Sequence, residues 1–179
     1  ILKVYDLRRE PVMRESRDAI NKDFWPRNEA EALAILAPDH PLNRAYRQTS
    51  TYWEMVYGMA KHGVVATEFL LESNGEGLLL FARVEPYLAA IRAKTSPRAL
   101  MNAEWIAGSC DLAKAIMTTF RGRIAAKHGA KPLARIAGYA KSGVDHKIMG
   151  TGPISAVRKL MQKTGWTLDQ LDLAPEVEV

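Results

Sequence analysis

Residues 42–61 read LNRAYRQTSTYWEMVYGMAK, which is the clearest helical pattern in the chain. Mainly apolar side chains recur there at spacings of three and four, namely Tyr46, Thr49, Trp53, Val56, Tyr57 and Ala60. This spacing places them on one face of an α-helix. Gly63 follows, and a glycine just beyond the last turn commonly ends a helix. The pattern therefore predicts a helix over 42–61. Its aromatic residues resemble a cofactor-binding box, but their spacing favours a role in the core.

Amphipathic segments on both sides of this helix extend the prediction. Proline and glycine separate the segments, and no strand with strict alternation occurs before residue 130. Five or six such segments with short connections predict a mainly α fold, a helical bundle over residues 1–129. The expected helices are 11–25, 28–36 capped by Asn28, 42–61, 66–73, which can continue over 77–94 with a kink or new start at Pro86, 96–106 opened by Ser96-Pro97, and 110–127.

The pattern changes after residue 130, where a short second segment, 130–179, is expected. Residues 132–140 are compatible with a buried strand, and a glycine-rich turn and a helix over 154–164 follow. A single strand leaves its backbone groups unpaired, so the segment has to become helix, lie irregularly on the bundle or pair with another chain. The sequence therefore predicts self-association into a homo-oligomer.

Charge is distributed unevenly along the 179 residues, although the net charge is only +5. Residues 1–120 are neutral overall, whereas residues 121–163 carry ten basic side chains and one acidic side chain. A basic block of this kind attracts phosphate-bearing ligands such as coenzyme A or nucleic acid. It contains few aromatic side chains on which bases could stack, which weakens the nucleic-acid interpretation. A solvated basic face without a specific partner is the simpler alternative.

Composition places the chain among cytoplasmic globular proteins. No apolar run is long enough to span a bilayer, so we expect no membrane association. Residues 1–10 are charged and lack the apolar stretch of a signal peptide. The single cysteine, Cys110, suits a reducing compartment.

Three short motifs in the first two thirds of the chain resemble an uncharacterised group of helical bacterial proteins. They are Phe24-Trp25-Pro26, Ser50-Thr51-Tyr52-Trp53-Glu54-Met55 and Asn74-Gly75-Glu76. The resemblance covers roughly residues 6–107. It implies a helical fold and no particular activity.

Residues 127–173 resemble the C-terminal segment of a thiolase (acetyl-CoA acetyltransferase). The matching motifs occur in order without gaps: KPLARI over 131–136, GVD over 143–145, MGTGP over 149–153 and DQLDL over 169–173. In thiolases the Met-Gly-x-Gly-Pro turn lies near the acyl pocket and a helix follows it. The resemblance and the basic block together suggest a ligand-binding set for coenzyme A or another phosphorylated ligand, namely Met149, Gly150, Gly152, Arg158 and Lys159.

The resemblance does not extend to the catalytic residues of a thiolase. That chemistry needs a nucleophilic cysteine, a second cysteine, a histidine and an oxyanion hole. Cys110 is the only cysteine, and it lacks the flanking glycines of the thiolase nucleophile. Residues 174–179 read APEVEV where thiolases carry an Asn-Glu-Ala-Phe motif. We therefore expect no thiolase activity and predict a buried, structural Cys110 on a helix.

Metal ligands are the other candidates that the sequence offers. Glu68, Glu72 and Glu76 are spaced four residues apart, and His62 precedes them. His62, Glu68 and Glu72 could line a bundle interior and hold a metal ion, although a solvated acidic face is the simpler interpretation. The cofactor is therefore unknown.

Several functions stay open from sequence alone. The first is a non-catalytic helical module fused to a thiolase fragment without catalytic residues. The second is a binding protein for acyl-CoA or another phosphorylated ligand. The third is an enzyme of unrecognised type with a bundle pocket lined by carboxylates such as Glu54, Glu68 and Glu72. The fourth is nonspecific nucleic-acid binding.

Overall fold

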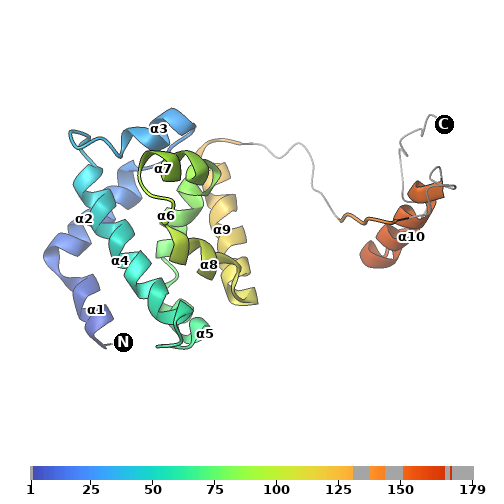
Figure 1. Ribbon diagram of the computed structural model, residues 1–179, viewed down its shortest axis with the longest axis horizontal. Helices are drawn as coiled ribbons and strands as arrows, with labels where there is room; N and C mark the ends of the chain where they lie inside the picture. Colours follow the sequence, from blue (N-terminus) through green and yellow to red (C-terminus); the bar gives the residue numbers. More distant parts are fainter. Residues whose placement is uncertain (1, 131–137, 144–150, 168–169, 171–179) are drawn as a thin grey trace. The chain divides into compact units, whose positions relative to one another are not determined.

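The computed structural model describes residues 2–130, 138–143, 151–167 and 170. The chain divides into two compact units, Ile1–Lys131 and Pro132–Val179, here named the helical unit and the C-terminal unit. No strand occurs among the described residues, so the predicted mainly α fold is confirmed. The helical unit contains α1 (Leu2–Arg9), α2 (Pro11–Asp23), α3 (Glu29–Ala34), α4 (Asn43–Lys61), α5 (Thr67–Asn74), α6 (Gly77–Val84), the 3₁₀ turn η1 (Glu85–Tyr87), α7 (Leu88–Lys94), α8 (Met101–Gly108) and α9 (Asp111–Lys127) (Figure 1).

Helix α6 forms the centre of the helical unit. All eight of its residues are buried, and it packs against α4, α8 and α9. A helix that is apolar on every side is stable only when other elements surround it. The run GLLLFA over 77–82 has this composition, which explains its position. No described helix is both long enough and apolar enough to cross a membrane.

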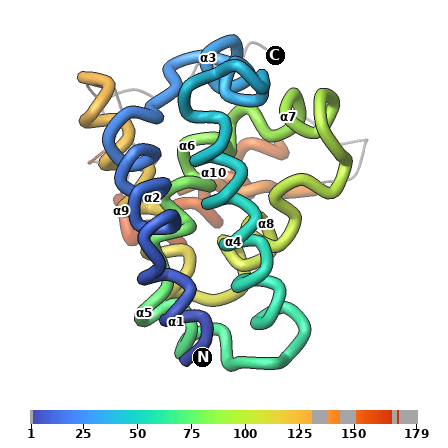
Figure 2. Tube along the Cα trace, turned by 90° about the vertical axis from the view of Figure 1, so that its left-hand side faces the viewer, coloured from blue at the N-terminus to red at the C-terminus, as the bar shows by residue number. Residues whose placement is uncertain are grey.

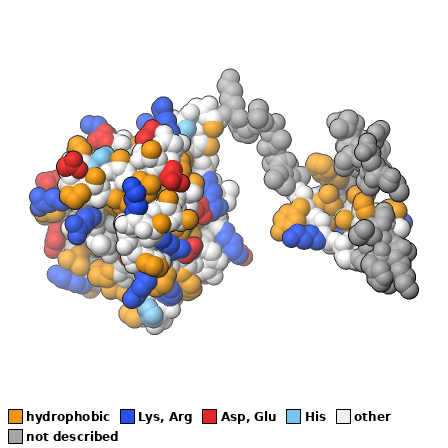
Figure 3. Space-filling model, turned by 45° about the horizontal axis from the view of Figure 1, so that its top comes forward, with side chains coloured by type: hydrophobic (Ala, Val, Ile, Leu, Met, Phe, Trp, Pro, Cys, Tyr) orange, Lys and Arg blue, Asp and Glu red, His pale blue; other side chains and the backbone are white. Residues whose placement is uncertain are grey.

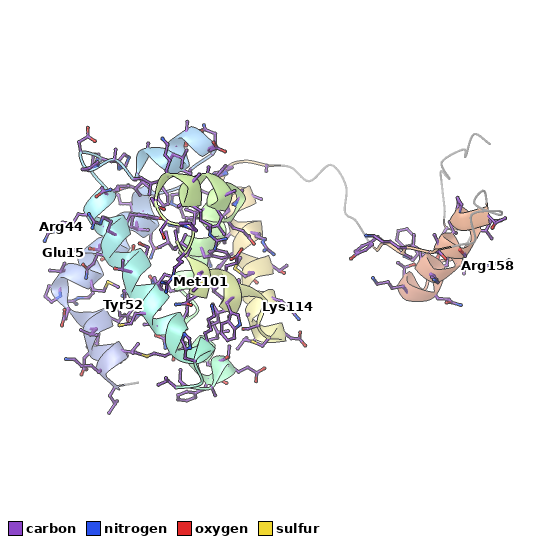
Figure 4. All side chains as sticks on the ribbon, in the orientation of Figure 1. Glu15, Arg44, Tyr52, Met101, Lys114 and Arg158 are labelled. Atoms are coloured by element: carbon purple, nitrogen blue, oxygen red, sulfur yellow. The ribbon has the colours of Figure 1, made fainter. Side chains whose placement is uncertain are left out.

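Helices α2 and α4 lie side by side and pack extensively on one another (Figure 2). The four aromatic residues of α4 are buried, which confirms their predicted role in the core. Two of them also fix neighbouring segments through their hydroxyl groups. Tyr52 (Figure 4) donates a hydrogen bond to the carbonyl of Val4 at 2.7 Å, and Tyr57 donates one to the carbonyl of Asn74 at 3.0 Å. Helix α4 therefore connects α1 with the end of α5.

Local signals in the sequence explain most of the helix ends. Asn28 caps α3, since its side-chain oxygen accepts a hydrogen bond from the backbone N–H of Glu31 at 2.9 Å. Gly63 follows α4 with a φ of 71°, which glycine adopts without strain. Pro86 separates α6 from α7, as predicted, and the 3₁₀ turn η1 forms there.

Three features differ from the sequence prediction. Helix α1 was not expected, because half of residues 2–9 are charged and only Val4 is buried. The expected helix 77–94 is divided into α6, η1 and α7, so the helical unit has more helices than the predicted five to six. Helix α8 begins at Met101, whereas Ser96-Pro97 predicted an earlier start. The hydroxyl of Ser96 instead accepts a hydrogen bond from the N–H of Arg98, which forms a turn.

The C-terminal unit contains α10 (Gly152–Thr164), which includes the predicted helix 154–164. Gly165 ends α10 in the left-handed conformation. Residues 138–143 have no regular secondary structure, and the hydroxyl of Ser155 donates to that of Ser142 at 2.6 Å. The rest of the expected strand, 132–137, lies outside the described residues. Self-association through that strand therefore stays a prediction.

Candidate ligand-binding site

A groove of about 570 Å³ lies between α4 on one side and α7 with the segment before α8 on the other. This volume falls within the range of small-molecule sites. Its walls combine buried apolar side chains with polar groups. The residues that line it are Leu36, Pro38, Asn43, Tyr46, Arg47, Ser50, Thr51, Glu54, Ile91, Thr95, Arg98, Ala99 and Leu100.

The floor of the groove is apolar, and its side chains pack against the hydrophobic core. Tyr46, Ile91 and Leu100 are buried, and the ring of Tyr46 packs edge-on against Phe24 with centroids 5.8 Å apart. Burial, with a smaller effect of the Glu54 charge, raises the pKa of Tyr46 to about 12. Its hydroxyl therefore stays protonated at neutral pH. Among the described residues the hydroxyl has no hydrogen-bond partner, which leaves it available as a donor to a ligand.

Exposed arginines stand at the rim of the groove. Arg47 on α4 and Arg98 in the segment before α8 both line it, and neither forms an ion pair with any described residue. An adjoining hollow of about 330 Å³ adds Arg44 (Figure 4), which is also unpaired among these residues. We call Arg44, Arg47 and Arg98 the basic rim. Guanidinium groups are well suited to bind carboxylate and phosphate in two-point geometry.

Glu54 is the carboxylate that lines the groove, and its two oxygens accept hydrogen bonds from α8. One oxygen accepts a hydrogen bond from the backbone N–H of Ala103 at 2.8 Å, and the other accepts one from Asn102 at 3.1 Å. These N–H groups belong to the first turn of α8, which carries a partial positive charge. Glu54 thus caps α8 from α4, and the partial positive charge of that helix end offsets part of its negative charge.

The sequence-predicted metal ligands are not gathered into a site. His62 follows the last residue of α4, whereas Glu68 and Glu72 lie on α5, and all three are exposed. Within the described part of the chain, no group of three His, Cys, Asp or Glu side chains could hold a metal ion. Glu76, the third glutamate of this series, lies beyond α5 and binds arginines instead.

The predicted ligand-binding residues of the C-terminal unit are described only in part. Met149 and Gly150 lie outside the described residues. Gly152 is the first residue of α10, and Arg158 (Figure 4) and Lys159 lie on that helix as exposed side chains. The nitrogen of Lys159 is 3.4 Å from the hydroxyl of Ser142. Ligand binding by this set stays a prediction.

Charges of both signs cover the surface of the helical unit. On the face seen in Figure 3, Lys and Arg side chains alternate with Asp and Glu side chains and do not form one basic patch. Part of the basic block is also engaged internally, because Arg121 on α9 forms an ion pair with Glu85 at 2.6 Å. This face gives no support to nonspecific nucleic-acid binding, which depends on clustered cations.

Cys110 caps α9, contrary to the prediction of a buried cysteine within a helix. Its sulfur accepts a hydrogen bond from the N–H of Ala113 at 3.5 Å, and the residue is half-buried. The prediction was wrong because Asp111, and not Cys110, is the first helical residue, so the cysteine occupies the position that Ser, Thr and Asp usually fill.

Cys110→Ser should therefore be tolerated, since serine is a stronger N-cap, whereas Cys110→Ala should remove the cap. We expect the serine variant to exceed the alanine variant by about 1 kcal/mol in free energy of unfolding, measured by urea denaturation. If alanine were equal to serine, the thiol would not act as a cap.

Sequence reasoning missed the basic rim and Tyr46 as functional residues. Arg47 and Arg98 are 51 positions apart, and nothing in the local pattern indicates that they share a groove. The signal that was available is the motif Ser50–Met55, which resembles a known group of proteins. Three of its residues, Ser50, Thr51 and Glu54, line the groove.

Comparisons with known proteins match two separate parts of the chain. A family described as a domain of unknown function (DUF4760) matches residues 1–110, and the thiolase C-terminal domain matches residues 130–178. Both resemblances predicted from the sequence are thereby confirmed. No solved structure matches the chain.

Curated relatives match only the C-terminal part. An acetyl-CoA acetyltransferase of Paracoccus denitrificans is 61% identical over 49 residues, which are 27% of this chain and 12% of that protein. One from Pseudomonas aeruginosa is 60% identical over 45 residues, which are 25% of this chain and 12% of that protein. The cytosolic enzyme of Mus musculus is 46% identical over 43 residues, 24% of this chain and 11% of that protein. The chain thus spans about an eighth of the length of these relatives. Because the longer match covers more than half of the sequence, the chain belongs to the DUF4760 family and carries a segment related to the thiolase C-terminal domain.

Proposed function

We propose that the helical unit is a binding module for a small amphipathic anion, such as a medium-chain carboxylate, and that the ligand occupies the groove beside α4. The observation that supports this function best is that Arg47 and Arg98, which form no ion pair with any described residue, lie above an apolar floor. Sites of this composition hold the apolar body of a ligand by burial and orient it with a few polar groups.

The floor and the rim fit different parts of one ligand. An alkyl chain that enters the groove covers Ile91, Leu100 and the ring of Tyr46, and each buried methylene contributes about 0.8 kcal/mol. A carboxylate at the rim receives charge-assisted hydrogen bonds from Arg47 and Arg98, and the protonated Tyr46 hydroxyl supplies another donor. An uncharged ligand of the same length lacks the second contribution.

A binding role is favoured over a catalytic one by the state of Glu54. A carboxylate that serves as general base needs a free lone pair directed at the substrate. Both oxygens of Glu54 accept backbone hydrogen bonds from α8, so that its role is structural. The carboxylate-lined pocket predicted from Glu54, Glu68 and Glu72 also does not form, because the two other glutamates lie on α5 and do not line the groove.

Calorimetric titration of the full chain tests this proposal, with octanoate and octanol as probes of equal chain length. We expect octanoate to bind more tightly than octanol. The double variant Arg47→Gln/Arg98→Gln should weaken octanoate by at least tenfold, because one charge-assisted hydrogen bond is worth about 1.5 kcal/mol or more. Its affinity for octanol should stay unchanged.

Arg14→Gln provides the matched control. Arg14 is an exposed arginine on α2 that lies outside the groove and has no side-chain partner among the described residues. The Arg14→Gln variant loses one positive charge outside the groove, so it should bind octanoate as tightly as the wild type does. If Arg14→Gln weakened octanoate as much, per charge removed, as the double variant does, only net charge would attract the anion, and the assignment of the groove would be overturned.

A further inference from the structure

A second cavity, of about 460 Å³, lies between α2, α6 and α9 and shares no lining residue with the groove. It is lined chiefly by polar and aromatic side chains. These polar and aromatic residues are Asn21, Trp25, Glu76, Arg83, Phe120 and Arg123. We call it the Arg83 cavity.

Arg83 is a buried cation that forms no ion pair with a carboxylate of the described residues. Its side chain belongs to the central helix α6, and the residue is only 2% exposed. The guanidinium donates to the carbonyl of Ile20 at 2.9 Å and to the amide oxygen of Asn21 at 3.3 Å, and it stacks on Trp25 at 3.9 Å. Its Nε is buried and has no hydrogen-bond partner among the described residues. Buried charges in proteins are normally paired.

Glu76 is the carboxylate that lines the cavity, but it is already hydrogen-bonded to other groups. Its oxygens accept hydrogen bonds from Arg8 at 2.8 Å, from the Nε of Arg17 at 2.9 Å and from the amide of Asn21 at 2.9 Å. Two arginines therefore already share one negative charge. Glu76 forms ion pairs with Arg8 and Arg17 and acts on Arg83 only through its charge, so an excess of positive charge remains around the cavity.

Further cations from α9 add to this excess. Arg123 lines the cavity and packs over Phe120 at 5.5 Å, and Lys127 lies over the ring of Trp25 at 5.7 Å. Neither forms an ion pair with a described residue. Burial lowers the pKa of Arg83 to about 10, and the nearby charge of Arg123 lowers it too. Arg83 is thus still charged at neutral pH and repels Arg123.

We propose that the Arg83 cavity is an oxyanion site that binds phosphate, either as the inorganic ion or as the phosphoryl group of a small phosphomonoester, between Arg83 and Arg123. The ligand supplies the missing counter-charge for two like-charged guanidinium groups. A phosphate dianion matches Arg83, Arg123 and Lys127 better than a carboxylate does, because it carries more charge and more acceptor oxygens. The rings of Trp25 and Phe120 offer an aromatic wall to the organic part of a monoester.

Calorimetric titration of the full chain at constant ionic strength tests this site with inorganic phosphate, phenyl phosphate and phenol. We expect phosphate to bind the wild type and Arg123→Gln to weaken it by at least tenfold. Arg123 is exposed, so this variant is expected to fold. Tighter binding of phenyl phosphate would identify a monoester as the natural class, equal binding would identify inorganic phosphate, and phenol alone should not bind.

Lys114→Gln is the control on the same helix. Lys114 (Figure 4) is an exposed residue of α9 that does not line the cavity. Its substitution removes one positive charge, as Arg123→Gln does. It should leave phosphate affinity unchanged, and so should Arg47→Gln in the groove. Loss of binding in Arg47→Gln would assign the phosphate to the groove. The proposal would be overturned by that result, by equal phosphate affinity of the wild type and Arg123→Gln, or by the absence of binding at millimolar phosphate. Each of these outcomes is independent of octanoate binding.

Discussion

Replacing Glu76 by glutamine should lower the free energy of unfolding by about 3 kcal/mol, because removal of one partner from a largely buried ion pair leaves the other charges uncompensated. Glu76 is the point where α1 and α2 meet the turn before α6, since it accepts hydrogen bonds from Arg8, Arg17 and Asn21. Its side chain is 20% exposed. Urea denaturation measures the loss. Glu72→Gln, an exposed glutamate on α5, should change stability by less than about 0.5 kcal/mol.

The contribution of Glu76 to the free energy of unfolding should also depend on pH. Burial alone would raise the pKa of Glu76, but the hydrogen bond and charge of Arg17, with Asn21 and Arg8, hold the pKa below the ordinary value of 4.5. The contribution is therefore complete above the unfolded-state pKa and is lost as the pH falls through the lower pKa of the folded protein. The difference between wild type and Glu76→Gln should shrink on acidification. A difference that stayed constant down to pH 2 would contradict this role of the charge.

Gly77→Ala should also be strongly destabilising, by about 3 kcal/mol or more. A Cβ at Gly77 would lie 2.5 Å from ring atoms of Trp53 and 2.5 Å from the hydroxyl of Tyr57. Both rings are buried within α4, so neither can move aside, and overpacking of a filled core costs free energy. Thermal and urea denaturation should both show the loss.

Gly122→Ala is the matched control for this prediction. Gly122 lies within α9, is exposed and would meet nothing within 4 Å of an added Cβ. Alanine is favoured over glycine inside a helix, so this variant should be more stable by roughly 0.5–1 kcal/mol. If both substitutions shifted stability in the same direction, the close approach of α6 to Trp53 would not control the packing of the core.

Local chemistry was sufficient to predict most of the helices. The period of Tyr46, Trp53 and Tyr57 predicted α4 and its buried face, and the side chain of Asn28 predicted the start of α3. Pro86 predicted the interruption between α6 and α7. In each of these places the deciding interaction is made within a few residues of sequence. Helix α1 was missed because it contributes only Val4 to the core and owes its position to long-range contacts such as that of Arg8 with Glu76.

The start of α8 depends on a residue far away in the sequence. Leu100 precedes it with a φ of 54°, an unusual conformation for leucine. The N–H groups of Asn102 and Ala103 are capped by Glu54, which is 48 and 49 positions distant. A local reading of Ser96-Pro97 placed the helix start several residues too early for this reason.

The candidate sites could not be predicted for the same reason. The groove joins Arg47 to Arg98, and the Arg83 cavity joins Arg83 to Arg123. The basic block includes Arg123, but the sequence does not show that Arg83, on an otherwise apolar helix, lines the same cavity. For the groove, the motif Ser50–Met55 pointed to one wall, but nothing in it indicates that Arg98 lies opposite.

A crystal structure of the full chain soaked with octanoate would test the binding function most directly. We expect the carboxylate within hydrogen-bond distance of Arg47 and Arg98, with the alkyl chain against Ile91 and Leu100. An empty groove at a saturating concentration, or octanoate bound only elsewhere on the helical unit, would contradict it.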